Sequence, residues 1–288
     1  MKILITGAGG QVGRALASSA PANSHVVTCL RHDLDIVDPS AVMRRVCREK
    51  PDVIINAAAY VAADRAESEA ELARRINADG PRYLATAARE VGARLVHIST
   101  DYVFDGTSSI PYAPEAPTHP LSVYGVTKRA GEEAVLAVLP DAAVIVRTAW
   151  VYAPRGHNFV LTMLNLMRKS GSIRVVADRV GTPTSAASLA KTLWEVIRRP
   201  EVRGIHHWTD AGMASWYDFA VAIAEEGASL GLLSEDVTVT PISAQEYPAP
   251  ARRPSYSVLD KSSLTSLGIA PVHWRKQLRS VLGELKSA

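Results

Sequence analysis

Two residues with ionisable side chains have a spacing that could support proton transfer. Tyr124 and Lys128 are four residues apart, so both side chains lie on one face if residues 122–138 form a helix. A cation beside a phenol favours the phenolate, and Lys128 is therefore expected to lower the pKa of Tyr124. Ser99 or Thr100, which follow an apolar run, could hold a substrate oxygen. A Tyr-x-x-x-Lys pair also occurs by chance, so its context must support it.

A glycine-rich segment near the start of the chain provides such a context. Gly7, Gly10 and Gly13 follow an apolar run at residues 3–5 and precede a segment with helical periodicity. In dinucleotide-binding turns these glycines allow a tight turn, approach of the pyrophosphate and close packing of helix and strand. The free N–H groups of the helix then face the phosphates. The alternative is a tight turn that binds nothing.

The end of the second predicted strand bears on the choice of cofactor. Many dinucleotide-binding domains have an acidic residue here that binds the ribose 2′-hydroxyl of NAD. This chain has Arg31, and a guanidinium suits the 2′-phosphate of NADPH. Asp33 or Asp35 could still reach the ribose, and Arg31 could be an ordinary surface residue. We therefore expect NADPH in preference to NADH, with both retained as candidates.

The elements that must position these residues alternate along the first half of the chain. The predicted strands are residues 3–5, 25–30, 53–55, 95–98 and 142–148, and the predicted helices are residues 12–19, 38–50, 64–79, 81–91 and 122–138. Alternating strands and helices without hairpin signals are typical of an α/β fold with a doubly wound, Rossmann-like parallel sheet. Ala58 and Ala59 follow the third strand, where small residues let a dinucleotide lie against the backbone.

The second half has a different character and predicts a smaller mixed α/β substrate-binding region. Its predicted helices are residues 158–169, 188–199, 215–226 and 278–285, and its predicted strands are residues 174–176, 204–208 and 237–241. We expect residues 1–150 to form the dinucleotide-binding domain and residues 151–288 to form mainly the substrate region. Residues at about 180–210 are expected to return to the first domain.

Composition limits the possible functions. The 288 residues are 47% hydrophobic and 21% charged, with a net charge of +3, as in an ordinary globular protein. The basic residues are scattered, which argues against nucleic-acid binding, and no apolar run is long enough to span a membrane. Cys29 and Cys47 lack the spacing of metal or redox motifs, and His206 and His207 would point to opposite faces of a strand. We expect a cytoplasmic protein without bound metal.

Several motifs together resemble one known family. They are TGAGGQVGRAL at the start, NAAAYVAAD at 56–64, HISTDYVFDG at 97–106, YGVTKRAGE at 124–132, RTAWVY at 147–152, RVGTPTSA at 179–186 and RRPSYSVLD at 252–260. The chain resembles the extended short-chain dehydrogenase/reductases and, within them, the dTDP-4-dehydrorhamnose reductase family. The resemblance covers nearly the full length. It implies NAD(P)H-dependent reduction of the C4 ketone of a dTDP-linked 6-deoxy-4-keto sugar.

The resemblance also implies roles for individual residues. Tyr124 is the expected proton donor, Lys128 its partner and Thr100 the hydroxyl that holds the ketone. The expected cofactor contacts are Gly7, Gly10, Gln11, Val12, Arg31, Asp35, Ala58, Ala59, Tyr60 and Lys128, and the expected sugar site contains Asp101, Tyr102, Trp150 and Asn158. Arg253 could bind the diphosphate of a nucleotide sugar because a guanidinium suits phosphate, although Arg252 and Arg253 could equally be a surface pair.

Departures from the family pattern affect two expectations. Tyr60 is followed by Val61, so one hydroxyl that could touch the cofactor or sugar is missing. Two glutamates that hold magnesium at a dimer contact in some members correspond to Ala15 and Ala187. We therefore expect no metal and either a monomer or a homodimer of another kind. The alternatives are a related reductase or epimerase acting on another sugar or carbonyl compound, and a non-catalytic dinucleotide-binding regulatory subunit.

Overall fold

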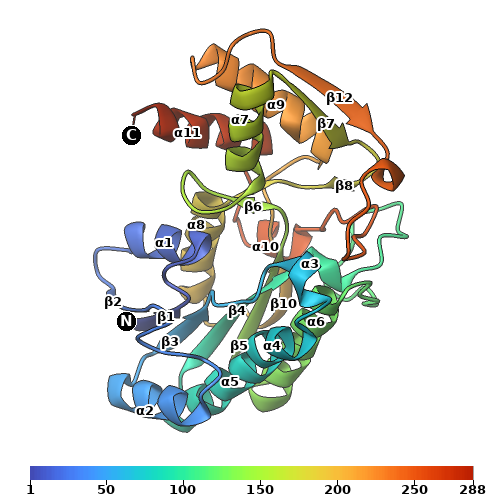
Figure 1. Ribbon diagram of the computed structural model, residues 1–288. Helices are drawn as coiled ribbons and strands as arrows, with labels where there is room; N and C mark the ends of the chain where they lie inside the picture. Colours follow the sequence, from blue (N-terminus) through green and yellow to red (C-terminus); the bar gives the residue numbers. More distant parts are fainter. Residues whose placement is uncertain (288) are drawn as a thin grey trace.

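The computed structural model describes residues 1–287 and contains a six-stranded parallel sheet (Figure 1). The strands are β1 (Lys2–Thr6), β2 (His25–Cys29), β3 (Val53–Asn56), β4 (Arg94–Thr100), β5 (Ala143–Thr148) and β10 (Gly204–His207). Their order across the sheet is β10-β5-β4-β3-β1-β2, and every neighbouring pair is parallel. The predicted α/β fold with a doubly wound parallel sheet is confirmed.

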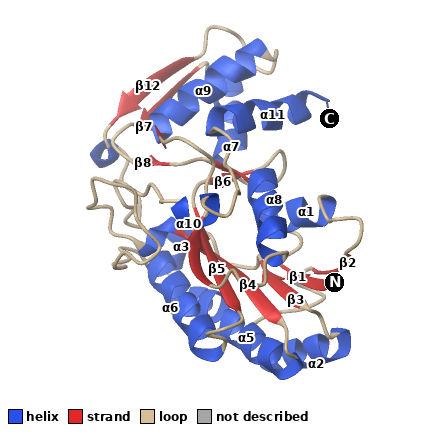
Figure 2. Cartoon of the chain, turned by 180° about the vertical axis from the view of Figure 1, so that it is seen from behind, coloured by secondary structure: helices blue, strands red, loops and turns tan. Residues whose placement is uncertain are grey.

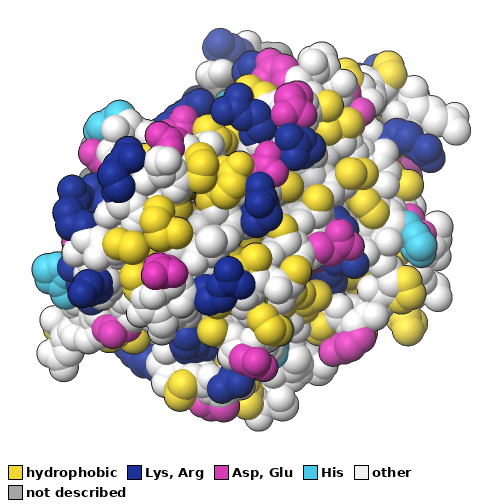
Figure 3. All heavy atoms as spheres, turned by 90° about the horizontal axis from the view of Figure 1, so that it is seen from below, with side chains coloured by type: hydrophobic (Ala, Val, Ile, Leu, Met, Phe, Trp, Pro, Cys, Tyr) yellow, Lys and Arg dark blue, Asp and Glu magenta, His cyan; other side chains and the backbone are white. Residues whose placement is uncertain are grey.

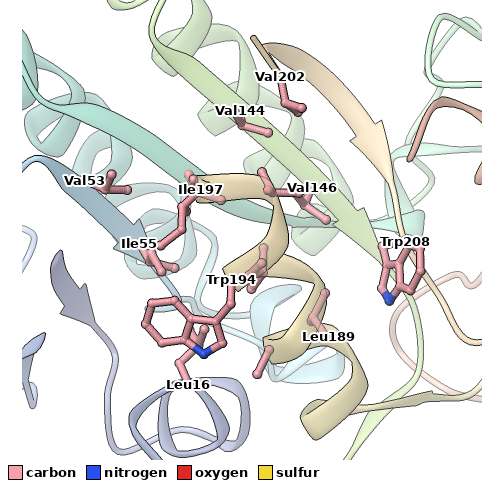
Figure 4. Packing of buried hydrophobic residues seen from close by; sticks show 14 of the residues in the cluster. Leu16, Val53, Ile55, Val144, Val146, Leu189, Trp194, Ile197, Val202 and Trp208 are labelled. Carbon is pink, nitrogen blue, oxygen red and sulfur yellow. The ribbon is translucent and has the colours of Figure 1, made fainter. Parts of the chain in front are cut away.

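Helices cover both faces of this sheet, as its apolar strands require. One face packs against α1 (Gln11–Ser18) and α8 (Ala186–Ile197), where Leu16, Leu189 and Trp194 meet the strand residues shown in Figure 4. The other face packs against α2 (Pro39–Glu49), α5 (Gly80–Val91) and α6 (Val123–Val138), and Figure 2 shows both layers from behind.

The order of the strands creates a crevice at one edge of the sheet. β1 has β2 on one side and β3 on the other, so the chain reverses direction across the sheet between β2 and β3. The carboxyl ends of β1 and β3 are in register, with Thr6 opposite Asn56. In sheets of this type, ligands bind outside the carboxyl ends of the strands at such a switch point. The glycine turn starts directly after Thr6.

The second half adds a smaller layer with its own core. Its main helices are α7 (Phe159–Ser170), α9 (Trp216–Ser229) and α11 (Trp274–Ser287), which pack with the parallel pair β7 (Ser172–Val176) and β12 (Thr238–Ile242) (Figure 1). Two short pairs join it to the rest: β6 (Val151–Tyr152) with β9 (Thr184–Ser185), and β8 (Val180–Gly181) with β11 (Ala214–Ser215). α8 packs on the large sheet, and β10 is one of its strands, so both lie with the first half of the chain. We keep the division near residue 150 as a proposal.

The prediction of one continuous helix over residues 64–79 is wrong. The structure has α3 (Ala63–Ala66), a break, α4 (Ala70–Arg74) and a π-helical turn η1 (Arg75–Asp79) that runs directly into α5. Pro81 lacks an N–H and would crowd the carbonyl four residues earlier in a regular helix. The wider π turn before it relieves this conflict, so Pro81 does not start a separate helix.

Other boundaries differ in the second half. The predicted helical residues 278–285 continue a helix that begins at Trp274, and β7 begins at Ser172 rather than at residue 174. The two-residue strands are too short for any periodicity to predict. Small elements include η2 (Asp101–Val103), η3 (Ala244–Glu246) and α10 (Ser262–Thr265).

The surface is mixed in character. On the face shown in Figure 3, Lys and Arg side chains are interspersed with Asp and Glu. Within residues 1–287, none of the helices has both the length and the apolar character needed to cross a bilayer.

Candidate active site

The glycine turn after β1 is shaped for close approach of a ligand. Gly7 has a φ of +68°, and a Cβ there would lie 2.5 Å from the backbone nitrogen of Ala58. A Cβ on Gly13 would collide with the carbonyl oxygen of Gly7. Gly10 is the N-cap of α1 and provides no side chain to the first N–H groups of the helix. These N–H groups can therefore bind a dinucleotide pyrophosphate, and the turn fits that group.

Arg31 lies in the turn that follows β2, beside this glycine turn. A Cβ on Gly9 would be 3.2 Å from Leu30, the residue before Arg31, and the Arg31 side chain is exposed. Asp33 accepts a hydrogen bond from the Leu30 amide at 2.9 Å, and Asp35 accepts one from the Val37 amide at 3.2 Å. The two acids thus stabilise their own loop, whereas the exposed Arg31 side chain is available for a ligand, and its contact with an adenosine ribose stays a prediction.

The other expected cofactor contacts surround the carboxyl ends of β1 and β3. Val12 and Ala58 are half-buried and pack against the two sides of the sheet, and Ala59 is half-buried next to Ala58. The Tyr60 hydroxyl donates to Glu69 at 2.6 Å, which raises the pKa of Tyr60. The Tyr60 amide also donates to Asn77.

The local structure of α6 determines where Tyr124 lies. Ser122 caps the helix by accepting from the Gly125 amide at 3.2 Å, and Glu67 accepts from the Val123 amide at 2.9 Å. A Cβ on Gly125 would collide with the backbone carbonyl oxygen of Tyr102. Glycine at this position therefore lets the first turn of α6 lie directly on η2.

Tyr124 does not have the lowered pKa that we expected from Lys128. Burial raises the pKa of Tyr124, and the neighbouring Thr100 hydroxyl offsets the shift only in part. The charge of Asp101 raises it further. The prediction of a lowered phenol pKa is wrong for the protein without ligands, because loss of hydration outweighs the other influences. Tyr124 therefore holds its proton firmly at neutral pH.

Thr100 lies next to this phenol, and its role in holding the ketone stays a prediction. It ends β4, accepts from the Tyr102 amide at 3.2 Å and donates to Asp101 Oδ1 at 3.0 Å. Burial raises the pKa of Asp101 to about 6. Ser99, the other candidate, is buried, and its hydroxyl has no hydrogen-bond partner among the described residues. Of the two hydroxyls, Thr100 is the one that faces Tyr124.

Lys128 is deeply buried one helical turn after Tyr124. Its Nζ donates to the Ile98 carbonyl at 2.7 Å and lies 3.2 Å from His97 Nε2. Burial lowers the pKa of Lys128 to about 8, and the charge of Glu132 opposes this shift. Lys128 therefore exchanges its proton near physiological pH, unlike an exposed lysine.

Trp150 has a strained backbone at the beginning of the second half. Its φ is +49°, which is unfavourable for a bulky residue, and its ring stacks on Trp216 with centroids 3.5 Å apart. A Cβ on Gly181 would lie 2.7 Å from the Trp150 ring. Packing on both sides thus holds the indole, and such strain is common at ligand sites.

Three cationic and aromatic side chains meet near the expected sugar site. Arg253 donates to Asp64 Oδ2 at 2.7 Å and also lies beside Tyr102 and Arg179. Burial and the adjacent Arg253 lower the pKa of Arg179. The Tyr102 ring contacts Tyr124 edge-on, with centroids 5.3 Å apart. Our site prediction omitted Arg179, although the arginine that opens the RVGTPTSA motif was visible in the sequence.

Asn158 connects the two halves of the molecule. Its Oδ1 caps α7 by accepting from the Leu161 amide at 3.0 Å, and its Nδ2 donates to Gln11 Oε1 at 2.8 Å and to the Ala153 carbonyl at 2.9 Å. Its polar atoms are therefore engaged by protein groups. Contact of Asn158 with a sugar stays a prediction.

Within residues 1–287, no group of three or more His, Cys, Asp or Glu side chains is arranged to hold a metal ion. His206 instead contacts Ser263 and the Arg203 carbonyl, while His207 contacts the Tyr112 carbonyl.

Comparison with known proteins gives a consistent result. Residues 1–287 match the family model described as RmlD substrate binding domain. The chain is 44% identical to a dTDP-4-dehydrorhamnose reductase of Streptomyces griseus, covering 96% of this chain and 91% of that protein. It is 43% identical to a probable dTDP-4,6-dihydroxy-2-methyloxan-3-one 4-ketoreductase of Streptomyces antibioticus, covering 100% and 97%. A crystal structure of dTDP-4-dehydrorhamnose reductase from Bacillus anthracis with NADP has a TM-score of 0.92 and 36% identity, covering 98% and 99%.

Proposed function

This chain belongs to the RmlD substrate binding domain family, and from that premise we propose that it reduces the C4 ketone of dTDP-4-dehydro-L-rhamnose to dTDP-L-rhamnose. Members of the family with this degree of similarity are NAD(P)H-dependent nucleotide-sugar 4-ketoreductases. The choice of sugar is our proposal, because relatives of similar identity carry the names of different dTDP-sugar reductases.

One observation carries the catalytic part of the proposal. The Thr100 hydroxyl and the Tyr124 phenol meet at the carboxyl edge of the sheet, where β4 ends and α6 begins. A bound nicotinamide cofactor would supply the hydride. Tyr124 would transfer its proton to the sugar oxygen on which negative charge develops. The Thr100 hydroxyl would donate to the same oxygen once it turns away from Asp101 Oδ1.

The raised pKa of Tyr124 suits this role. A phenol that keeps its proton at neutral pH is a donor at the start of each reduction. Lys128 then stabilises the phenolate that forms, since the two side chains lie one turn apart on α6.

Two further features support the choice of ligands. Exposed Arg31 beside the glycine turn suits the 2′-phosphate of NADPH, so we propose NADPH as the preferred cofactor and NADH as the weaker one. Arg253 and Arg179 form a pair of adjacent guanidiniums next to Tyr102, which suits the diphosphate of a nucleotide sugar. Trp150 would cover the sugar. We also propose a cytoplasmic location and a monomer or homodimer without bound metal.

The direct test is reduction of a panel of dTDP-linked 4-keto-6-deoxy sugars with NADPH or NADH, followed by loss of absorbance of the reduced cofactor. We expect turnover with dTDP-4-dehydro-L-rhamnose and a decrease in kcat of about 10²-fold or more in Tyr124→Phe, with NADPH binding retained. Full activity in Tyr124→Phe would exclude the proposed proton donor.

The same assay separates the alternatives. A related reductase would favour another keto sugar, and an epimerase would convert substrate without net oxidation of the cofactor. A regulatory subunit would bind NADPH and turn over none of the sugars.

A further inference from the structure

A chain of buried polar groups runs under the active site from the end of β1 to Lys128. Thr6 donates to Asn56 Oδ1 at 2.7 Å, and Asn56 Nδ2 lies 2.9 Å from His97 Nδ1. His97 Nε2 in turn lies 3.2 Å from Lys128 Nζ. Asn56 and His97 are also opposite each other in the register of β3 and β4. None of these side chains is more than slightly exposed.

Hydrogen-bond donors and acceptors determine the orientation of Asn56. The Ala58 backbone N–H lies 3.1 Å from Asn56 Oδ1 and can only donate. The oxygen of the amide must therefore face Ala58, and the NH₂ group must face His97. Reversal of the amide would set the Ala58 N–H against another donor inside the protein.

This orientation determines the tautomer of His97. Burial lowers the pKa of His97 well below its usual range, so the ring is neutral and has a single N–H. His97 Nδ1 accepts from the Asn56 amide, so the proton is on Nε2. That N–H points to Lys128.

The tautomer has a consequence for Lys128. The Ile98 carbonyl accepts one N–H from Lys128 at 2.7 Å. A neutral amine has a lone pair that can accept from His97 Nε2–H, whereas an ammonium has only donors and would oppose that N–H. We propose that Asn56 and His97 act as positioning residues that present the Nε2–H of His97 to Lys128 and thereby make its ammonium give up a proton more readily than it would without that N–H.

Other charged groups around Lys128 do not replace this effect. Glu132 on α6 favours the ammonium, but it forms a buried ion pair with Arg147 of β5 at 2.7 Å. Arg129 is 3.9 Å from the same carboxylate. Tyr124, on the preceding turn of α6, stays protonated at neutral pH. Burial and the His97 N–H thus act in the same direction on Lys128.

This inference rests on the proposed function only for its effect on turnover. When Tyr124 gives up its proton, the phenolate has to be reprotonated before the next cycle. A lysine that exchanges its proton near pH 8 can donate to the phenolate and recover the proton from solvent more readily than one with a pKa near 10. The reaction balances without a further reactant, since one proton and one hydride are added to the ketone.

Nuclear magnetic resonance tests the proposal without any assay of activity. Long-range ¹H–¹⁵N spectra distinguish the two histidine tautomers, and ¹⁵N signals of lysine Nζ report its titration. We expect an Nε2–H tautomer at His97 and a Lys128 pKa near 8, with His97→Gln and Lys128→Met used to assign the signals among the eight histidines and the lysines. An Nδ1–H tautomer, or a Lys128 that titrates near its unperturbed value of about 10.4, would overturn the proposal.

Asn56→Asp gives a second, nearly isosteric test. A carboxylate can only accept, so His97 should switch to the neutral Nδ1–H tautomer, and its Nε2 should then accept from the ammonium rather than oppose it. We expect the Lys128 pKa and the basic limb of the kcat profile to rise by about one pH unit or more. His206→Gln replaces a half-buried histidine on β10 and serves as a control. It should leave the Lys128 pKa and the basic limb of the kcat profile unchanged. Retention of the Nε2–H tautomer and of the pKa in Asn56→Asp would contradict the proposed coupling.

Discussion

At the scale of single residues, the site depends on how burial changes ordinary side chains. Burial raises the pKa of Tyr124 and lowers the pKa of Lys128, so in both groups it shifts the equilibrium toward the neutral form. Asp101 shows the same effect, because its pKa rises to about 6 and its Oδ2 has no hydrogen-bond partner among the described residues. Desolvation therefore dominates over attraction between charges in this site.

The first prediction concerns the stability cost of Asp101. Its raised pKa means that the folded state holds this proton more tightly than the unfolded state, so the free energy of unfolding falls as the pH rises from about 4 to about 6. Asp101→Asn removes the buried charge. We expect the variant to be more stable at pH 7 by on the order of 1–3 kcal/mol and to lose this pH dependence. Urea unfolding at pH 4 and pH 7 measures both effects, and equal stability of the two proteins at pH 7 would contradict the argument.

The second prediction concerns Arg31 and cofactor choice. Arg31→Ala should raise the KM for NADPH about tenfold or more, because a charge-assisted contact with the 2′-phosphate is lost. The KM for NADH should change little. Steady-state kinetics with each cofactor provide the measurement, and Arg44→Ala, an exposed arginine on α2, is the matched control. An equal effect on both cofactors would indicate that Arg31 does not contact the 2′-phosphate.

At the scale of elements, glycines allow the backbones around the site to approach closely. Gly13 brings α1 onto the glycine turn, and Gly125 brings α6 onto η2. These contacts are between backbones, so no neighbouring rotamer can relieve a clash. The distance between the Tyr124 and Thr100 side chains therefore depends on Gly125 having no Cβ.

The third prediction compares two helical glycines. Gly125→Ala should lower the free energy of unfolding by about 1–3 kcal/mol and reduce kcat, because α6 must move away from Tyr102. Gly283→Ala in α11 meets no atom within 4 Å and should raise stability by about 0.5–1 kcal/mol. Thermal unfolding and the reductase assay distinguish the two variants. Wild-type kinetics in Gly125→Ala would show that the close contact is unnecessary.

At the scale of the whole molecule, the two halves are joined beside the cofactor turn. The hydrogen bond from Asn158 to Gln11 spans 147 residues of sequence and connects α7 with the start of α1. The stacked Trp150 and Trp216 form a second connection, from the end of β5 to α9. Gln11, an expected cofactor contact, is thus tied by a hydrogen bond to the substrate region.

The fourth prediction is a measurable coupling between Gln11 and Asn158. In a double-mutant cycle with Gln11→Ala and Asn158→Ala, we expect a coupling of about 0.5–1.5 kcal/mol in the free energy of unfolding. Asn158→Asp keeps an oxygen that caps α7 and loses the donor to Gln11, so it separates the two roles. Additive effects in the cycle would indicate that the bridge contributes nothing.

The sequence alone was sufficient for the fold class, and it also indicated which local motifs to examine for a site. Strands such as residues 53–55 are apolar throughout, which predicts a parallel sheet covered on both faces, and glycine spacing locates the dinucleotide turn. The four-residue spacing of Tyr124 and Lys128 determines that they share a helix face. These are local properties of the chain, so they can be recognised before it folds.

Only the tertiary structure decided the properties that depend on neighbours from distant segments. The direction of the Tyr124 pKa shift follows from burial against β4 and η2. The helix predicted at residues 64–79 is interrupted at residues 67–69 and ends in a π turn before Pro81. The link of His97 to Asn56 and Lys128 depends on the register of β3 and β4 and on the packing of α6 against them. Desolvation and hydrogen-bond geometry arise from packing between elements, and sequence spacing does not specify that packing.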